Sequence, residues 1–315
     1  SAWFCEESGK QMQQPASAEQ THQNGDKMKR MMYMVAAMLL CIAATAQESE
    51  FLRRYNVLVG RVGPAGLGVE TLLDNWSKEE PDNPDQLVAR FHYYIVKSQG
   101  TEIVNRRDAK YLGLAPVLSL KDSTGTDVHY YELLTYDEAL FAEALKAADK
   151  AIAVYPERLD FRFMKANAYL SYERESPDMA LSNLIALVHE FMSGSGEWVY
   201  PQDAGAVSPV DKETFAQLMQ EYCYSFYSLG TPSGYEAFYK LSVKMNSFYP
   251  KNTDFLCNIG SYHMVAQNNC KTALKYYDKV LKIKPDDYSA LNNSVLAARK
   301  LKTPKLEKKY MKMLT

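Results

Sequence analysis

Four glycines between residues 57 and 73, in the stretch VLVGRVGPAGLGVETLL, are the nearest approach in this chain to phosphate-binding chemistry. Closely spaced glycines let backbone N–H groups reach the phosphates of a dinucleotide. Their order departs from G-x-G-x-x-G, Pro64 removes one backbone donor, and no strand–helix–strand unit surrounds them. We therefore interpret the stretch as a corner between two helices. The four residues are Gly60, Gly63, Gly66 and Gly68.

Metal-ligating residue types are present, but their spacing is unsuitable for a metal. The segment DSTGTD, residues 122–127, has a superficial likeness to a calcium loop, yet it lacks the third ligand position and the distant glutamate. We interpret it as a hairpin turn. Four histidines show no H-E-x-x-H or other paired spacing; they are His92, His129, His189 and His263. No metal and no cofactor are predicted.

Motifs of the large enzyme classes do not occur in the sequence. There is no G-x-S-x-G elbow, no phosphate-binding G-x-x-x-x-G-K and no kinase signature. The expectation is a protein that is not an enzyme. Catalytic groups distant in sequence can still meet in a fold, so an enzyme built around the 98–135 region remains the third alternative. The net charge of −2 offers no basic face for nucleic acid.

The start of the chain has the layout of an export signal. Residues 28–46 combine a basic start, a 13-residue apolar run at 31–43 and an Ala-Thr-Ala site. The protein is therefore expected to be exported, either periplasmic or secreted, with residues 1–27 a disordered upstream segment. Two alternatives are an uncleaved anchor and an outer-membrane lipoprotein attached through Cys41, although Leu40 is large for that site. Membrane contact is expected only through this signal or peripherally.

Three cysteines remain after residue 46, namely Cys223, Cys257 and Cys270. An odd number in an exported protein argues against a disulfide framework. We predict that all three are buried thiols.

Prolines mark an internal repeat. Ala144 is followed by Ala148 after four residues and by Pro156 after twelve. Small residues at this spacing let helices approach closely, and the proline ends the second helix of a pair. The pattern recurs at Val69-Leu73-Pro81 and Ala273-Tyr277-Pro285, and with one extra residue at Ala237-Leu241-Pro250.

A second outline, Leu256-x2-Ile259-Gly260-x2-His263, precedes the repeat at 273–285. Together these patterns resemble those of tetratricopeptide-repeat proteins, best at 253–285, well at 139–190 and weakly before residue 98. The resemblance implies stacked helical hairpins with a concave groove lined by the first helix of each pair. The expected fold of residues 47–315 is all-α, an irregular TPR-like α-solenoid of about four to five helical hairpins.

The repeat pattern divides the chain into expected elements. A β-hairpin is expected as an insertion at 98–135, where β-favouring runs flank a Ser-Thr-Gly turn, and a Gly, Ser and Pro-rich loop at 193–210. Helices are expected at 49–62, 66–79, 84–97, 136–155, 158–173, 177–192, 211–229, 233–248, 253–266, 270–283, 286–301 and 303–314.

The resemblance also selects a binding stripe on the first helices. Carried over residue by residue, it comprises Asp160, Phe163, Asn167 and Leu170, then Asp254, Cys257 and Ser261. The family's carboxylate clamp is absent, because Asn167 and Asn292 lack accompanying Lys and Arg. A nearby basic stripe is interpreted as a solvated face; it consists of Arg158, Arg162 and Lys165.

Aromatic residues supply the remaining candidates. Trp198 and Tyr200 lie in the 193–210 loop, and loops carry function more often than core elements do. Tyr224 lies in a tyrosine-rich helix, whose aromatics fill the core in the alternative interpretation. The leading hypothesis is an exported scaffold that binds a protein or peptide through its concave face. The second is a soluble-ligand binder, for sugar or peptide. Nothing in the sequence predicts the oligomeric state.

Overall fold

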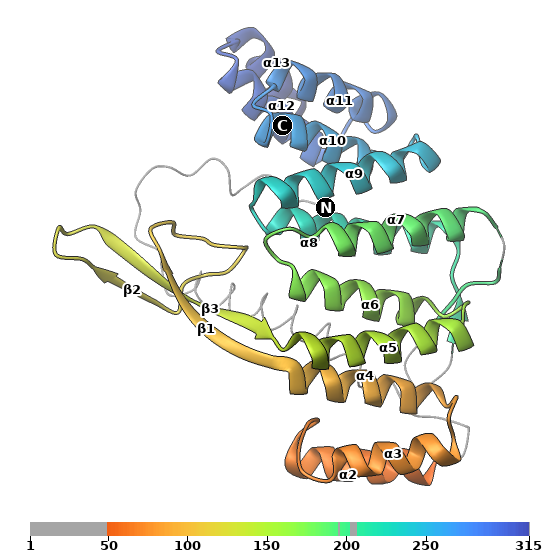
Figure 1. Ribbon diagram of the computed structural model, residues 1–315. Helices are drawn as coiled ribbons and strands as arrows, with labels where there is room; N and C mark the ends of the chain where they lie inside the picture. The colour runs from red at the N-terminus through yellow and green to blue at the C-terminus, as the bar shows by residue number, and fades with distance from the viewer. Residues whose placement is uncertain (1–48, 195, 202–206, 315) are drawn as a thin grey trace. The chain divides into compact units, whose positions relative to one another are not determined.

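The computed structural model describes residues 49–194, 196–201 and 207–314. The predicted upstream segment and signal peptide, residues 1–46, lie outside this range. Within it the chain is mostly helical, with twelve helices and a small antiparallel sheet, so the expected all-α class is broadly correct (Figure 1). No helix of the described residues is both long and apolar enough to cross a bilayer.

The chain divides into two compact units, which we describe separately. The first, the N-terminal unit, contains α2 to α7 and all the described strands. Its helices are α2 (Glu50–Val62), α3 (Val69–Glu79), α4 (Pro84–Ser98), α5 (Glu138–Val154), α6 (Leu159–Tyr172) and α7 (Asp178–Met192). Its strands are β1 (Gln99–Arg106), β2 (Leu118–Lys121), β3 (Asp127–Tyr136), β4 (Val199–Pro201) and β5 (Val207–Pro209).

The second, the C-terminal unit, is built from helices alone among the described residues. They are α8 (Lys212–Ser228), α9 (Pro232–Phe248), α10 (Thr253–Val265), α11 (Cys270–Ile283), α12 (Tyr288–Lys300) and α13 (Pro304–Leu314). Each helix packs on the next along the chain. The three cysteines are free and buried, as predicted, and burial raises the pKa of Cys223 to about 12.

Helix starts follow from short polar side chains at the N-cap. Asn83, for example, accepts hydrogen bonds from the amides of Asp85 and Gln86, and Pro84 occupies the first helical position, where no N–H is needed. Asp137, Thr231, Asn252, Asn269 and Asp287 cap α5, α9, α10, α11 and α12 in the same way. The repeat prolines Pro81, Pro156, Pro250 and Pro285 all lie in turns between helices. Pro156 therefore separates two helices and does not kink one.

Trp76 is the centre of the small core formed by α2, α3 and α4. Its side chain is fully buried, and its ring lies 6.1 Å from the rings of both Phe51 and Tyr55. The indole N–H donates to the carboxylate of Glu80 at 2.9 Å. That carboxylate also accepts from Ser49 at the start of α2 and from Asn83 at the start of α4. One aromatic residue and one carboxylate thus connect three helices.

The predicted hairpin insertion is a three-stranded antiparallel sheet, which we call the arm. Strand order is β1-β3-β2, with Gln99 opposite Tyr136 and Leu118 opposite Tyr130. The prediction missed β1, which continues directly from α4. Tyr131 on β3 is buried, close to the Tyr111 ring and donating its hydroxyl to the Asp108 carbonyl. The segment between β1 and β2 therefore covers one side of the sheet.

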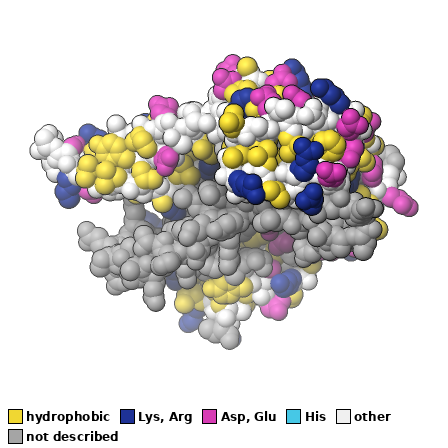
Figure 2. All heavy atoms as spheres, turned by 90° about the horizontal axis from the view of Figure 1, so that it is seen from below, with side chains coloured by type: hydrophobic (Ala, Val, Ile, Leu, Met, Phe, Trp, Pro, Cys, Tyr) yellow, Lys and Arg dark blue, Asp and Glu magenta, His cyan; other side chains and the backbone are white. Residues whose placement is uncertain are grey.

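The other side of the arm is apolar and exposed. The strand register places Ile103, Leu118, Leu120 and Leu134 on this side, each about half exposed. Figure 2 shows yellow side chains gathered on the projecting arm.

Helix α10 is the buried centre of the C-terminal unit. Residues 255–262 are all buried, and α10 contacts α8 and α12 as well as its chain neighbours α9 and α11. The Asn258 side chain donates to Gln220 on α8 at 2.8 Å, and Gln220 donates back at 3.3 Å. Alternate helices thus form one layer, joined by a reciprocal amide pair.

Gly260 lets α10 and α11 approach closely. A Cβ atom at this position would lie 2.6 Å from Cε1 of Tyr277, whose side chain is fully buried. We expect Gly260→Ala to destabilise the protein by about 1–2 kcal/mol, because overpacking outweighs the better helix preference of alanine. Chemical denaturation measures the effect. The matched control is Gly60→Ala in α2, which meets nothing within 4 Å. Gly60→Ala should raise the free energy of unfolding by up to about 1 kcal/mol. If both variants changed the free energy of unfolding in the same direction, the close-packing account would be refuted.

Candidate binding surface

The corner between α5 and α6 places two charged side chains at the start of α6. The Arg158 guanidinium binds both carboxylate oxygens of Asp160, each at 2.7 Å, and lies 4.6 Å from the centre of the Phe161 ring. Both charged side chains are more than four-fifths buried. Asp160 lies in the first turn, where the helix dipole favours a negative charge. Its carboxylate is therefore held in a fixed position.

The described part of the predicted loop at 193–210 contains a small hairpin formed by β4 and β5. Val199 N–H donates to the Glu157 carbonyl at 3.0 Å, and Val210 N–H donates to the Trp198 carbonyl at 2.8 Å. Arg158 and Val199 also form an isolated bridge. Backbone bonds therefore attach the hairpin to the α5–α6 corner.

This attachment brings predicted residues from distant parts of the sequence together. The Tyr200 ring lies 6.0 Å from Phe163 on α6, and the Trp198 ring lies 5.9 Å from Phe191 on α7. The Arg162 guanidinium lies 5.8 Å from the Trp198 ring. We call the set the hairpin–α6 surface; it comprises Asp160, Arg162, Phe163, Glu190, Trp198 and Tyr200.

The predicted solvated basic stripe is half-buried and ion-paired, so that expectation is wrong. Arg162 binds Glu190 at 2.8 Å and Lys165 binds Asp149 at 2.5 Å, while Arg158 binds Asp160. The acidic partners on α5 and α7 reach α6 because both helices pack against it. Positive charge is balanced locally in this region.

Two buried N–H donors on the hairpin–α6 surface have no acceptor among the described residues. They are Nε1 of Trp198 and Nε of Arg162. A buried donor without a partner costs about 1–3 kcal/mol, and native proteins keep few of them. Gln86, Arg90 and Arg174 in the same unit also have a buried nitrogen without an acceptor among the described residues. On the hairpin–α6 surface, two such donors belong to side chains that contact each other.

Several predicted contact residues in the N-terminal unit are core residues. Phe163 is 1% exposed and Trp198 is 8% exposed, because the hairpin and α7 cover them. Asn167, Leu170 and Tyr200 are half-buried, and the Asp160 side chain keeps only 15% of its surface exposed. A partner could thus touch the latter four directly, while the buried rings support them.

The predicted binding stripe on α10 is mostly buried, so the expectation that it lines an open groove is wrong for two of its three residues. Ser261 is 2% exposed and lies 3.3 Å from the Tyr277 hydroxyl, and Cys257 is buried against Asn293. Packing of α10 between α8 and α12 covers both. Asp254 is half-buried at the start of α10, where burial and the nearby Asp287 charge raise the pKa of its carboxyl. Only Asp254 of this stripe is accessible.

The tyrosine-rich helix α8 matches the core-filling alternative for most of its aromatics. Tyr222 and Phe226 are buried, and Tyr227 packs against Tyr235 and Phe238. Tyr224 is 41% exposed and is the accessible ring of the predicted set.

An aromatic stack in the C-terminal unit was not predicted. Tyr239 stacks on Tyr262 at 4.2 Å, and His263 stacks on Tyr276 at 5.7 Å. Tyr262 donates to Glu236 and accepts from Gln267. Burial lowers the pKa of His263 below its ordinary value. The stack joins α9, α10 and α11. Its residues are spaced irregularly along the sequence, so only His263, which belongs to the repeat outline, could have been singled out.

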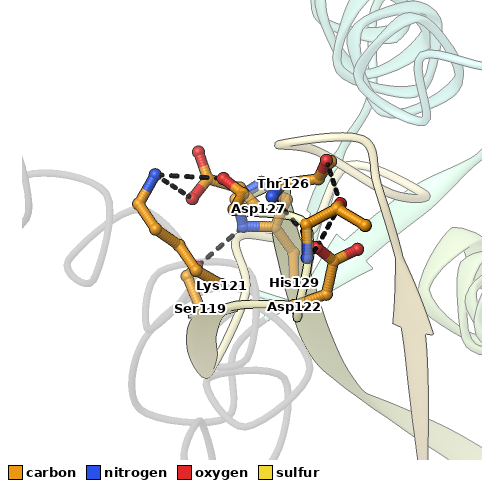
Figure 3. Close-up of polar contacts among 8 residues, drawn as sticks. Ser119, Lys121, Asp122, Thr126, Asp127 and His129 are labelled. Carbon is orange, nitrogen blue, oxygen red and sulfur yellow. Dashed lines mark hydrogen bonds and ion pairs between the residues drawn. The ribbon is translucent and has the colours of Figure 1, made fainter.

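The DSTGTD segment is a hairpin turn, as interpreted (Figure 3). One carboxylate oxygen of Asp122 accepts from the amides of Thr124 and Thr126 and from the Thr124 hydroxyl. Gly125 adopts φ 82°, as this turn requires. Across the strands above it, Ser119 contacts His129 at 2.7 Å. No cluster of three or more His, Cys, Asp or Glu suited to a metal occurs in the described part of the chain.

The glycine-rich stretch at 57–73 is a helix–corner–helix, as interpreted. Helix α2 is followed by Gly63 with φ 82°, and Gly68 with φ 86° precedes α3.

Comparison with family models gives no match for this chain, and comparison with curated proteins gives none either.

Proposed function

We propose that this protein is an exported helical-repeat scaffold that binds a protein or peptide partner and has no catalytic role. In the N-terminal unit we assign the contact to the hairpin–α6 surface. The accessible parts of Asp160 and Tyr200, together with Asn167 and Leu170 further along α6, provide mixed polar and apolar contacts of the kind found at the rim of protein interfaces. Export itself rests on the signal pattern at 28–46.

The observation that carries the proposal is a pair of buried donors, Trp198 Nε1 and Arg162 Nε, for which the described residues supply no acceptor. Both donors are covered in the structure, so a partner would reach them by displacing the β4–β5 hairpin. A carboxylate or carbonyl oxygen placed there would then satisfy them and offset their cost. Trp and Arg are also the residues that most often dominate binding energy at protein interfaces. The expected partner therefore presents an acceptor oxygen to this surface.

The repeat class is supported by packing in the C-terminal unit. Helix α10 contacts both alternate helices, α8 and α12, and a Cβ at Gly260 would meet Tyr277 where the repeat outline requires a close approach. Such arrays bury a continuous core by stacking pairs and leave one layer available for partners. On this basis we propose that the chain folds as a TPR-like solenoid.

A second candidate function, binding of a soluble ligand such as a sugar, is favoured by the aromatic stack. Tyr239, His263 and Tyr276 are half-buried, and Glu236 and Gln267 lie beside them as hydrogen-bonding groups. Native mass spectrometry of the purified full chain distinguishes this candidate, because a retained small molecule would appear as a defined mass increment.

The test is quantitative capture of envelope proteins on the immobilised full chain. Trp198→Phe replaces the indole with a smaller phenyl ring and removes its N–H, so we expect the captured partner to bind about tenfold more weakly. Tyr224→Ala, which changes an exposed ring in the other unit, is the matched control and should leave capture unchanged.

Equal capture by Trp198→Phe and the parent chain would contradict the assignment to the hairpin–α6 surface. Loss of capture with Tyr224→Ala alone would move the contact to α8. Recovery of no protein together with a retained small molecule would contradict the scaffold function and support the second candidate.

A further inference from the structure

Strand β1 forms an open edge of the arm. In strand order β1-β3-β2 it pairs, within the described residues, with β3 alone (Figure 1). Seven of its eight residues are exposed, and Val104 is half-buried. An exposed edge of this length offers a row of backbone N–H and C=O groups to another strand. It has no proline, the residue that commonly blocks such edges.

Hydrogen bonding fixes which β1 residues face outward. Asp137 N–H donates to the Ser98 carbonyl at 2.8 Å, at the base of the β1–β3 ladder. In an antiparallel ladder the direction alternates, so even-numbered β1 residues turn toward β3. At the other edge, the bond from Asp122 N–H to the Thr126 carbonyl likewise shows that the even-numbered residues of β2 turn toward β3. The outward amides and carbonyls of β1 therefore belong to Thr101, Ile103 and Asn105. The Asn105 carbonyl accepts from the Arg106 guanidinium at 2.8 Å, a bond that strand pairing would replace.

We propose that two copies of this chain associate through antiparallel pairing of β1 with β1 of the second copy, with the twofold axis at Val104. The product is one continuous six-stranded sheet, with three strands from each arm. This surface and this partner lie outside the function proposed above and do not depend on it.

Charge complementarity selects both the second copy and the register. With the axis at Val104, Glu102 of each copy lies directly opposite Arg106 of the other, giving two opposite-charge pairs. An axis at Ile103 would place Glu102 opposite Val104, and an axis at Glu102 would oppose two glutamates. Only the Val104 register pairs these charges, and opposite charges on facing strand positions stabilise a ladder.

The same register satisfies the outward backbone groups. Ile103 lies opposite Asn105 of the second copy, and the two positions exchange N–H···O=C bonds in both directions. Glu102 and Arg106 then occupy the non-hydrogen-bonded positions, where facing side chains are closer together. Pairing also merges the exposed apolar sides of the two arms, including Leu118 and Leu134, into one surface.

The decisive experiment is a charge swap measured by sedimentation equilibrium of the full chain at about 1–100 µM. We expect the parent chain to form dimers. Glu102→Arg and Arg106→Glu should each weaken dimerisation at least about tenfold, because each puts like charges opposite one another. The double variant should restore it. Within one chain these two residues are about 13 Å apart along the strand, so restoration reports contact between copies.

A backbone variant tests the edge independently of charge. Ile103→Pro removes an outward N–H and should abolish dimers while circular dichroism stays that of the folded chain. The matched control is Val104→Pro, which removes an inward N–H and should disrupt the arm itself. A parent chain that stays monomeric throughout, a swap that fails to restore dimers, or a dimer unaffected by Ile103→Pro would overturn the proposal. So would a monomer whose β1 edge binds a strand of another protein.

Discussion

Trp76→Ala is expected to lower the free energy of unfolding of the α2–α4 region by about 3–5 kcal/mol, the range for removing a fully buried Trp. The substitution leaves a cavity where the Phe51 and Tyr55 rings now pack. It also removes the indole donor to Glu80, which joins the starts of α2 and α4 to the end of α3. We expect α2 to detach before the rest of the unit unfolds.

Native-state hydrogen exchange measures this effect by region. Protection should fall in α2 and α3 and remain nearly unchanged in α10 and α11. Leu67→Ala is the matched control, because Leu67 lies between the same two helices and is 93% exposed. It should change stability by less than about 0.5 kcal/mol. Similar losses for both variants, or a uniform loss across the chain, would contradict the role of Trp76 as a local core.

Acidification is expected to destabilise the N-terminal unit through His92 on α4. Burial lowers the pKa of this imidazole to about 4, from an ordinary 6.5. Between these values the unfolded chain binds a proton that the folded chain does not, so stability is full above pH 6.5 and is lost as pH falls toward 4. The loss attributable to His92 is about 3 kcal/mol over this window.

The measurement is chemical denaturation at pH 7 and at pH 4, for the parent chain and for His92→Phe. Other titrating groups are common to both proteins, so the difference between the two pH dependences isolates His92. The parent chain should lose about 3 kcal/mol more than the variant. Parallel pH profiles would show that the imidazole is solvated in the folded protein.

Local chemistry explains why the helices could be predicted. Proline ends a helix through backbone geometry, and Asn or Asp at the N-cap starts one, so both signals act within a few residues. Pro84 after Asn83, for instance, marks the start of α4. The first strand of the arm was harder to predict, because β1 continues directly from α4 with no turn residue between them.

The candidate surfaces depended on information that local patterns do not carry. The family resemblance placed Phe163 on α6 and Ser261 on α10 in the predicted binding stripe, but the neighbouring elements decide whether these positions are exposed. The β4–β5 hairpin lies over Phe163, and α10 is enclosed between α8 and α12. Residues such as Glu190 and Tyr239 had no motif at all, since their role arises from contacts between helices.

The arm joins its helices without any linker. Ser98 ends α4 and Gln99 begins β1, while Tyr136 ends β3 one residue before α5, and the Asp137–Ser98 backbone bond joins the two junctions. A strand of this length extends roughly 30 Å. Since no residue separates β1 from α4 and Asp137 alone separates β3 from α5, we expect the arm to act mechanically as a lever. A force applied at its tip becomes a torque on the α4–α5 pair, so a load on the sheet is felt directly in the helices.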